Sequence, residues 1–424
     1  MLHQERIFPR QEPEGELTRE RSLSIQAVAL ALGSSAAQVL VAVIYIFTAR
    51  AMQPDDFGVV ATAMALGAVG AALLDFGANS YWVRELASGR LTQEQLNPRM
   101  ATRLSVAMAA AGIVIAAAVV TDTRFIATGV LLLSTTAVTI MLVPLRAARR
   151  AEFVGVLTVI DRAVAIVAFF MLLAVGVDAG HALWIGIALG DVILVGLVGF
   201  FERSTIRLRP RRFSNPWTGA KWFSLTTLSI SAQQMDLPIM TAFAGPAAAG
   251  IYGGVSRWIQ PMILATGSFT AAVAPFLAAQ PDLRGARPQL LRASWILAIT
   301  ILISIGVLLA APWLVTNLLG DEYAGATPVL RWLAAAMILN TVAQPMIAAL
   351  LARQLDHIAA VIMLASVLMQ LATVAALAPA LGAVSAGIGM FVAQAVQIAA
   401  SATFAVVLLR RRRHSTGKRS NGPA

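Results

Sequence analysis

Long apolar runs separated by short polar stretches recur along the chain from Leu23 to Leu409. Each run has about 20 residues, the length that an α-helix needs to cross a hydrocarbon core of ~30 Å. The pattern predicts membrane-spanning helices at residues 23–49, 59–77, 104–120, 125–143, 154–175, 182–201, 222–243, 251–277, 293–315, 328–351, 358–378 and 384–409. The chain is therefore predicted to be an all-α polytopic membrane protein with twelve transmembrane helices.

Composition supports this prediction. Of the 424 residues, 58% are hydrophobic and only 12% are charged, and the mean hydropathy is +0.77. A soluble domain would carry about twice that charged fraction. The first apolar run follows a charged leader and is too long for a signal-peptide core, so we expect it to stay in place as an anchor.

Short motifs repeat between the two halves of the chain. Pro54-x-x-x-Gly58 follows the first span, and Pro246-x-x-x-Gly250 follows the seventh. The segments 145–152 and 350–356, after the fourth and tenth spans, also resemble each other. Since each half holds an even number of spans, the halves are predicted to be parallel repeats around a central cavity. The expected parts are a tail at 1–22, a six-helix lobe at 23–201, a basic linker at 202–221, a second six-helix lobe at 222–409 and a basic tail at 410–424.

Basic residues are distributed unevenly between the two sides of the predicted topology. Of the 32 lysines and arginines, only Arg50, Arg124 and Arg331 lie on the side opposite the tails, and Arg162 and Arg257 lie within spans. The positive-inside rule therefore places both termini in the cytoplasm, with the chain in the cytoplasmic membrane. The basic stretches 207–212 and 410–413 are expected to contact anionic membrane lipids, and no nucleic-acid partner is predicted.

The seventh predicted span carries an unusual line of polar residues. Thr226, Ser229, Gln233 and Asp236 follow one another at spacings that place them on one helical face. A carboxylate facing lipid near the bilayer centre would cost at least ~2.5 kcal/mol. This face is therefore predicted to line a polar cavity.

Other spans also carry polar groups. Buried amides commonly serve as hydrogen-bonding contacts between helices, and we favour that interpretation for the glutamines and Asn340. We favour function for Asp236, Asp191 and Arg257, because intramembrane charge is costly. Asp75 and the pair Asp161 and Arg162 are left open between bracing and function. The candidate cavity residues are Asp236, Arg257, Asp191, Gln233, Gln260, Ser229, Thr226, Asn340, Gln344, Gln394 and Gln397, and Asp236 and Asp191 are also the candidates for ion coupling.

No pattern of catalytic residues is apparent. The chain has no cysteine, and its four histidines are far apart in sequence, which argues against a metal site. Phosphate-binding, metalloprotease and nucleophile-elbow motifs are absent from the sequence. We therefore predict no cofactor and no enzymatic activity, and favour transport.

Several segments resemble a known family. They are Ala49–Val60 (ARAMQPDDFGVV), Leu74–Arg84 (LDFGANSYWVR), Gln233–Asp236 (QQMD), Gly250–Arg257 (GIYGGVSR) and Leu319–Pro328 (LGDEYAGATP). In order and spacing they resemble the polysaccharide transporters, or oligosaccharide flippases, of the multidrug/oligosaccharidyl-lipid/polysaccharide exporter superfamily. The resemblance covers all twelve spans.

The resemblance implies two lobes around a cavity that opens alternately to each side of the membrane. It also implies an isoprenoid-diphosphate-linked oligosaccharide as substrate, flipped outward for assembly of a surface polysaccharide, with a polysaccharide polymerase and glycosyltransferases as candidate partners. Amide and hydroxyl side chains would bind the glycan, and arginine would bind the diphosphate. Two alternatives are a cation-coupled multidrug exporter of the same superfamily and a membrane glycosyltransferase or polymerase.

Overall fold

The computed structural model describes residues 33, 35–148, 150–206, 213–264, 266–267, 287–353 and 355–419. Throughout these ranges the regular structure is helical, and nine helices are long and apolar enough to cross a membrane. The predicted all-α polytopic architecture is confirmed. Three predicted segments lie outside the described residues: the tail 1–22, the start of the first span and the end of the eighth span.

The first half of the chain begins with a helix over Ser35–Arg50. It continues with α2 (Pro54–Asp75), the short α3 (Ala78–Ala87), α4 (Gln93–Thr121), α5 (Ile126–Met141), the short α6 (Val143–Ala147), α7 (Ala151–Ala174) and α8 (Ala179–Phe201). A 3₁₀ turn, η1 (Thr123–Phe125), precedes α5. Apart from α3 and α6, these helices correspond to the first six predicted spans.

The second half begins with α9 (Lys221–Ala232), the 3₁₀ turn η2 (Gln233–Met235) and α10 (Asp236–Ser256). Inside α10, Gly245 has φ 86° and ψ 169°, so the chain turns there and Pro246 starts a new helical segment. This break divides the seventh predicted span from the eighth, which continues through η3 (Arg257–Ile259). The last four spans are α12 (Arg287–Leu318), α13 (Ala326–Ala352), α14 (Asp356–Leu381) and α15 (Val384–Arg419), with η4 (Asp321–Tyr323) before α13.

Several helices extend beyond the apolar runs that predicted them. The helix α4 begins at Gln93, well before the predicted position 104, because Thr92 and Gln95 form a reciprocal capping box there. Similarly, α12 begins at Arg287 and α15 runs on to Arg419. Hydropathy marks only the part of a helix that lies in lipid, so it does not predict polar extensions of the helix.

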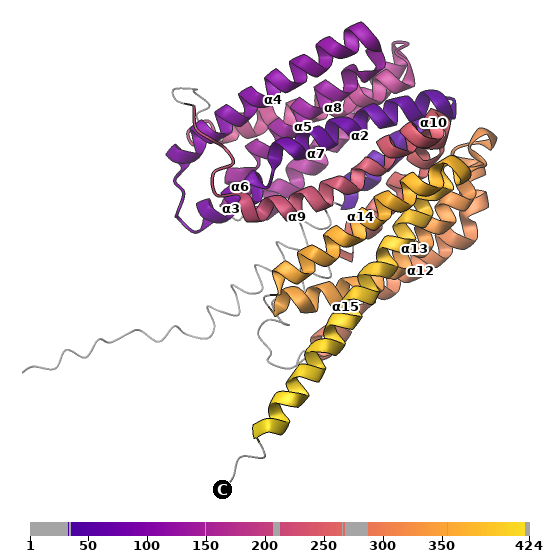
Figure 1. Ribbon diagram of the computed structural model, residues 1–424. Coiled ribbons are helices and arrows are strands. Elements are labelled where there is room, and N and C mark those ends of the chain that lie inside the picture. The colour runs from indigo at the N-terminus through magenta and orange to yellow at the C-terminus, as the bar shows by residue number, and fades with distance from the viewer. Residues whose placement is uncertain are drawn as a thin grey trace, which may run out of the picture.

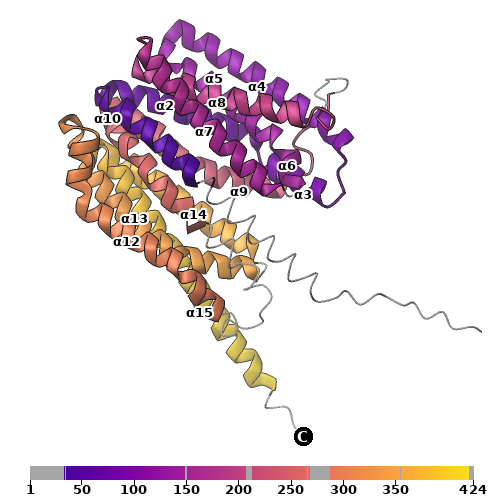
Figure 2. The ribbon, with the colours of Figure 1, turned by 180° about the vertical axis from the view of Figure 1, so that it is seen from behind.

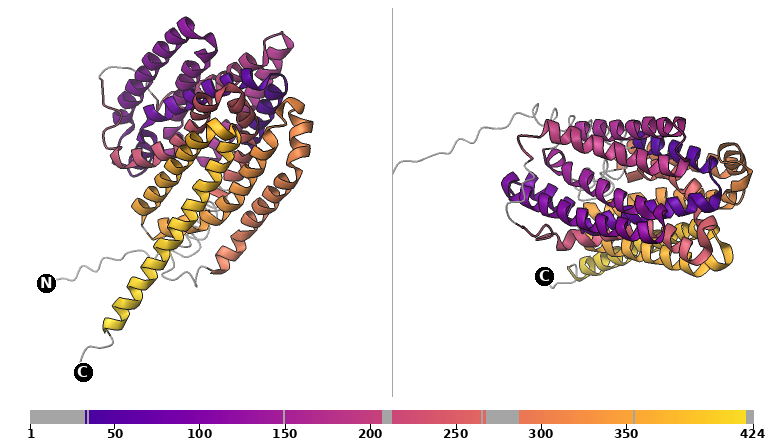
Figure 3. Two further views of the ribbon diagram at one scale, coloured as in Figure 1. Left: turned by 45° about the vertical axis from the view of Figure 1, so that its right-hand side comes forward. Right: turned by 90° about the horizontal axis from the view of Figure 1, so that it is seen from above.

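The two halves form two bundles (Figures 1 and 2). In the first bundle α2 and α4 pack on α5, and α7 packs on α8. In the second bundle α12 packs on α13, and α13 and α14 pack on α15. The bundles come together around α2 and α10, and the views from the side and from above agree on this arrangement (Figure 3).

The repeated Pro-x-x-x-Gly motifs meet directly at the junction of the bundles. A Cβ atom added to Gly58 would overlap the carbonyl oxygen of Pro246 and lie 2.8 Å from the nitrogen of Gly250. Conversely, a Cβ atom added to Gly250 would overlap the carbonyl oxygen of Pro54 and lie 3.0 Å from the nitrogen of Gly58. This reciprocal contact is what a twofold axis between two parallel repeats produces. The predicted internal repeat is therefore confirmed.

Hydrogen bonds between the bundles gather at the same end of the molecule. The guanidinium of Arg50 donates to the carbonyl of Asn317 at 2.9 Å, and the amide of Gln53 donates to Glu322 at 2.7 Å. The hydroxyl of Tyr323 donates to the carbonyl of Met52 at 3.3 Å. We call these residues, together with the Pro-x-x-x-Gly contact, the junction seal. It closes the end of the molecule that carries the turns after the first, seventh and ninth spans.

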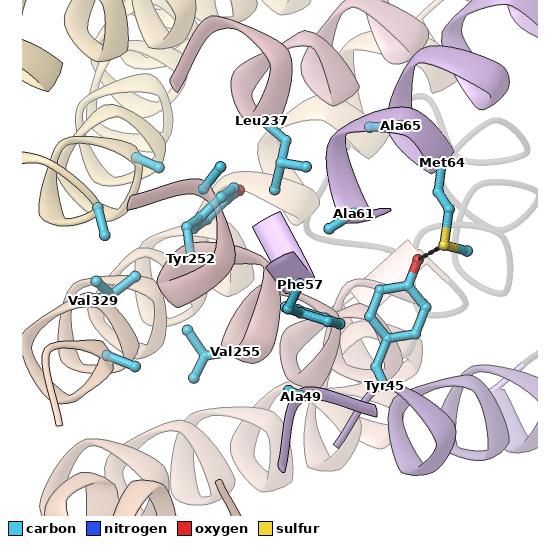
Figure 4. Packing of buried hydrophobic residues seen from close by; sticks show 14 of the residues in the cluster. Tyr45, Ala49, Phe57, Ala61, Met64, Ala65, Leu237, Tyr252, Val255 and Val329 are labelled. Atoms are coloured by element: carbon cyan, nitrogen blue, oxygen red, sulfur yellow. Dashed lines mark hydrogen bonds between the residues drawn. The ribbon is translucent and has the colours of Figure 1, made fainter. Parts of the chain in front are cut away.

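A shared apolar core supports the junction seal. Phe57 of α2 packs edge-on against Tyr45 and Tyr323, with ring centroids 6.1 and 6.5 Å apart. Figure 4 shows Tyr45 and Phe57 of the first bundle beside Tyr252 and Val255 of the second. The core thus continues from one bundle into the other at this end.

Candidate functional site

Asp236 lies at the start of α10, where the chain leaves the 3₁₀ turn η2. Its carboxylate accepts a hydrogen bond from the backbone amide of Leu237 at 2.7 Å, a short one from the hydroxyl of Tyr252, and one from the amide of Gln370 at 3.4 Å. The side chain is 8% exposed. Asp236 therefore fastens the seventh span to the eighth and to α14, within the second bundle.

Arg257 lies five residues after Tyr252 and is half-buried. Its guanidinium carbon is 5.2 Å from the centre of the Tyr45 ring, a cation–π contact between the two bundles. The Tyr45 hydroxyl in turn donates to the sulfur of Met64 at 3.6 Å. No carboxylate of the described residues lies within ion-pair distance of Arg257. Its positive charge is therefore held at the bundle interface by an aromatic ring, and the nearby Asp236 interacts with it electrostatically without forming an ion pair.

A second group of charged residues lies inside the first bundle. Arg162 contacts Asp161 at 3.2 Å and Asp191 at 3.4 Å, and the hydroxyl of Ser134 donates to Asp191 at 2.6 Å. Both aspartates are 1% exposed, and Oδ1 of Asp161 has no hydrogen-bond partner. Two buried carboxyl groups thus share one arginine, so this group holds one carboxyl group more than it has guanidinium groups.

The amide residues of the second bundle form a network among themselves. The hydroxyl of Thr266 donates to Asn340 at 3.0 Å, and the Asn340 amide donates to Gln394 at 3.2 Å. Gln397 is also buried, at 7% exposed. This geometry is that of interhelical hydrogen bonding, the interpretation favoured for these amides from the sequence.

The line of polar residues predicted along the seventh span does not form one uniform helical face. The 3₁₀ turn at Gln233–Met235 has three residues per turn and so rotates the register between α9 and α10. Gln233 is exposed whereas Asp236 is buried. Thr226 and Ser229 belong to α9, and their side chains lie outside the description. Gln260 and Gln344 are half-buried.

Sequence reasoning missed Tyr45, Tyr252 and Ser134, the residues that hold Arg257, Asp236 and Asp191 in place. No pattern in the sequence singled out Tyr45 or Ser134. Tyr252 could have been selected from the sequence, because it lies between Asp236 and Arg257 in the segment Gly250–Arg257 that resembles the family.

Comparison with solved structures supports this description of the fold. An inward-facing multidrug resistance transporter of the MATE family, from the MOP superfamily, aligns with a TM-score of 0.64 at 15% identity, over 94% of this chain and 100% of that one. The lipid II flippase MurJ in an inward closed conformation aligns with a TM-score of 0.65 at 11% identity, over 89% of this chain and 87% of that one. An outward-facing MATE transporter aligns with a TM-score of 0.51 at 16% identity, over 94% of this chain and 97% of that one. No curated protein matches the chain.

The two repeated bundles, with polar and charged groups enclosed in and between them, give the chain a multi-pass helical fold like that of these transporters. The model of the polysaccharide biosynthesis protein family matches residues 47–328, more than half of the chain. The chain therefore belongs to that family.

Proposed function

We propose that this transporter flips an isoprenoid-diphosphate-linked oligosaccharide outward across the cytoplasmic membrane, for export of a surface polysaccharide. The observation that carries the proposal is Arg257. An arginine that lies between the two bundles with no carboxylate partner among the described residues is suited to bind a diphosphate, because guanidinium groups bind phosphate oxygens with paired hydrogen bonds. The lipid tail of the substrate can remain in the bilayer while the polar headgroup passes between the bundles.

The proposed orientation places both termini and the basic loops in the cytoplasm, by the positive-inside rule. In that orientation the junction seal closes the outer end, and the substrate enters from the inside. The better alignment with the inward-facing MATE transporter than with the outward-facing one supports this assignment.

Ion coupling is proposed to supply the driving force, because the sequence has no ATP-binding motif. Of the two candidates, Asp191 together with Asp161 is the more suitable. Their group holds one carboxyl group more than it has guanidinium groups, and one oxygen of Asp161 has no partner, so the group can take up a proton or a monovalent cation. Asp236 already accepts three hydrogen bonds and interacts electrostatically with Arg257, so we assign it to fixing the helices and the charge of Arg257 for transport rather than to ion coupling.

The orientation can be tested with single cysteines, because the chain has none of its own. Ala324, beside η4, and Ser204, after α8, are both exposed. In intact cells Ala324→Cys should react with an impermeant thiol reagent, and Ser204→Cys should react only after the cells are opened. The reverse pattern of labelling would exclude the proposed orientation.

The substrate class can be tested by deleting the protein in its host. If the protein flips the lipid-linked glycan, its loss leaves synthesis intact. We therefore expect lipid-linked glycan to accumulate on the cytoplasmic leaflet, protected from a glycosidase added to right-side-out vesicles. The mature surface polymer should be lost, and the susceptibility to cationic drugs should not change.

The two alternative functions predict different results in the same experiment. A multidrug exporter would leave the surface glycan normal and raise drug accumulation on deletion. A polymerase would leave single repeat units on the outer leaflet, open to the glycosidase. Either result would contradict flipping. The partners proposed with this function are the glycosyltransferases that build the substrate and the polymerase that consumes it.

A further inference from the structure

A cavity of about 500 Å³ lies at the end of the first bundle opposite the junction seal. It is enclosed by α3, by the start of α4 and by the segment 213–220, which we call the strap. The strap is fastened to the bundle, because Trp82 donates to the carbonyl of Pro216 at 3.1 Å and Trp217 donates to that of Leu74 at 3.0 Å. The lining residues are Tyr81, Glu85, Arg90, Leu91, Gln95, Pro98, Arg99, Phe213 and Ser214.

The single acid in the cavity wall is already paired. Glu85 accepts two hydrogen bonds from Arg90, at 2.7 and 2.9 Å, and one from Arg84 at 3.2 Å. The hydrogen bond from Arg90 is the main reason that the pKa of Glu85 falls to about 2. Glu85 is therefore ionised at physiological pH, and two arginines share its one negative charge.

Arg99 and Arg103 lie in the same region, and both have buried nitrogen atoms without a hydrogen-bond partner. Arg99 lines the cavity and is half-buried, and its Nη1 makes no hydrogen bond. One turn further along α4, Arg103 is 0% exposed and binds Asp75 at 2.8 Å and Asn79 at 2.7 Å, but its Nε and Nη2 have no partner. Arg146 also interacts with Asp75. Among the described residues, the arginines of this region therefore outnumber its two carboxylates, Asp75 and Glu85.

We propose that this cavity binds the headgroup of an anionic phospholipid. Guanidinium groups bind phosphate oxygens with charge-assisted hydrogen bonds, and the half-buried Arg99 side chain that lines the cavity can make them. The cavity is far larger than one phosphate ion, which suits a phosphoglycerol headgroup. Phe213 at its edge is 84% exposed, as expected of a side chain that contacts an acyl chain at the membrane surface. The site is separate from Arg257 and does not depend on the proposed transport substrate.

The test is native mass spectrometry of the purified full-length protein with added phosphatidylglycerol or phosphatidylcholine. The wild type should retain phosphatidylglycerol in preference to phosphatidylcholine. Arg99→Gln should reduce this retention roughly tenfold, as expected for one lost charge-assisted interaction. The matched control is Arg203→Gln, because Arg203 lies at the same end but is exposed and stacks on Phe200 at 5.5 Å. It should change retention less than twofold, about the scale of one exposed charge.

A second variant guards against misfolding of Arg99→Gln. Gln95→Glu keeps the side-chain acceptor that binds the backbone of Thr92 and adds a negative charge to the cavity wall. It should also weaken retention of phosphatidylglycerol. The proposal is overturned if both lipids are retained equally by the wild type, or if neither cavity variant differs from Arg203→Gln. Displacement of the lipid by millimolar inorganic phosphate would also overturn it, because the site would then take free phosphate.

Discussion

Replacing Gly58 with alanine is expected to open the junction seal and to reduce transport roughly five- to a hundredfold, the range that corresponds to the free-energy cost of overpacking. The added methyl group would overlap the backbone carbonyl of Pro246, and a backbone atom cannot rotate away as a side chain can. Overpacking of this kind typically costs about 1–3 kcal/mol, which is enough to shift the balance between the closed and open states of this end. Gly250→Ala should have the same effect, because its contact with Pro54 is the symmetric counterpart.

A cysteine cross-link can measure the closed state directly. Gln53 and Glu322 are joined by a 2.7 Å hydrogen bond across the junction, and both side chains are longer than cysteine. Cysteines at these two positions should therefore be joined by a short bifunctional thiol reagent in an otherwise wild-type chain. Adding Gly58→Ala should lower the yield. Gly112→Ala is the matched control, because nothing lies within 4 Å of a Cβ atom at that position of α4. Unchanged cross-linking in Gly58→Ala, at normal protein levels in the membrane, would mean that the Pro-x-x-x-Gly contact does not control closure.

The membrane architecture was predictable because lipid imposes a strict rule on the sequence. A segment in hydrocarbon must satisfy its own backbone hydrogen bonds and present apolar side chains, so each span leaves a run of about 20 apolar residues. The repeat was predictable for a different reason. Pro54 with Gly58, and Pro246 with Gly250, are needed where two backbones touch, and glycine at a close backbone contact leaves a visible motif.

The interior of the site was less predictable, because hydrogen-bond partners come from helices that are distant in sequence. Asp236 was selected as an intramembrane charge, but its contact with Gln370 of α14 depends on how the helices pack. The argument from one helical face assumed an unbroken α-helix, and the 3₁₀ turn η2 changes that register. Spacing also could not show that Asn340 and Gln394 bind each other.

The group around Asp191 illustrates the same limit. The sequence did not decide whether Asp161 and Arg162 brace the structure or take part in function, because their depth in the membrane is compatible with both roles. In the structure Asp161 and Arg162 of α7 lie beside Asp191 of α8, and Ser134 of α5 donates a hydrogen bond to Asp191. An excess of one carboxylate over the available guanidinium is a property of the assembled group, and no single span carries that information.

Replacing Arg257 with alanine should reduce flipping of the lipid-linked oligosaccharide by roughly ten- to a hundredfold, the range expected when charge-assisted hydrogen bonds to a diphosphate are lost. The amount of protein in the membrane should not fall, because removing a charge from a span does not oppose insertion. Arg257→Lys should recover only part of the activity, since an ammonium group lacks the planar arrangement of donors that fits phosphate oxygens. Arg331→Ala, at an exposed position of α13, is the matched control and should behave like the wild type.

Asp236→Asn separates the charge of this site from its shape. The side-chain oxygen of asparagine can still accept hydrogen bonds from Tyr252 and Gln370, and only the bond from the Leu237 amide is lost. The contacts between helices should therefore persist while the negative charge near Arg257 is lost. We expect a loss of flipping, measured as the transfer of a labelled lipid-linked glycan in reconstituted vesicles, with thermal stability close to that of the wild type. If both Arg257→Ala and Asp236→Asn flip the glycan at the wild-type rate, neither charge takes part in transport, and Arg257 does not bind the diphosphate.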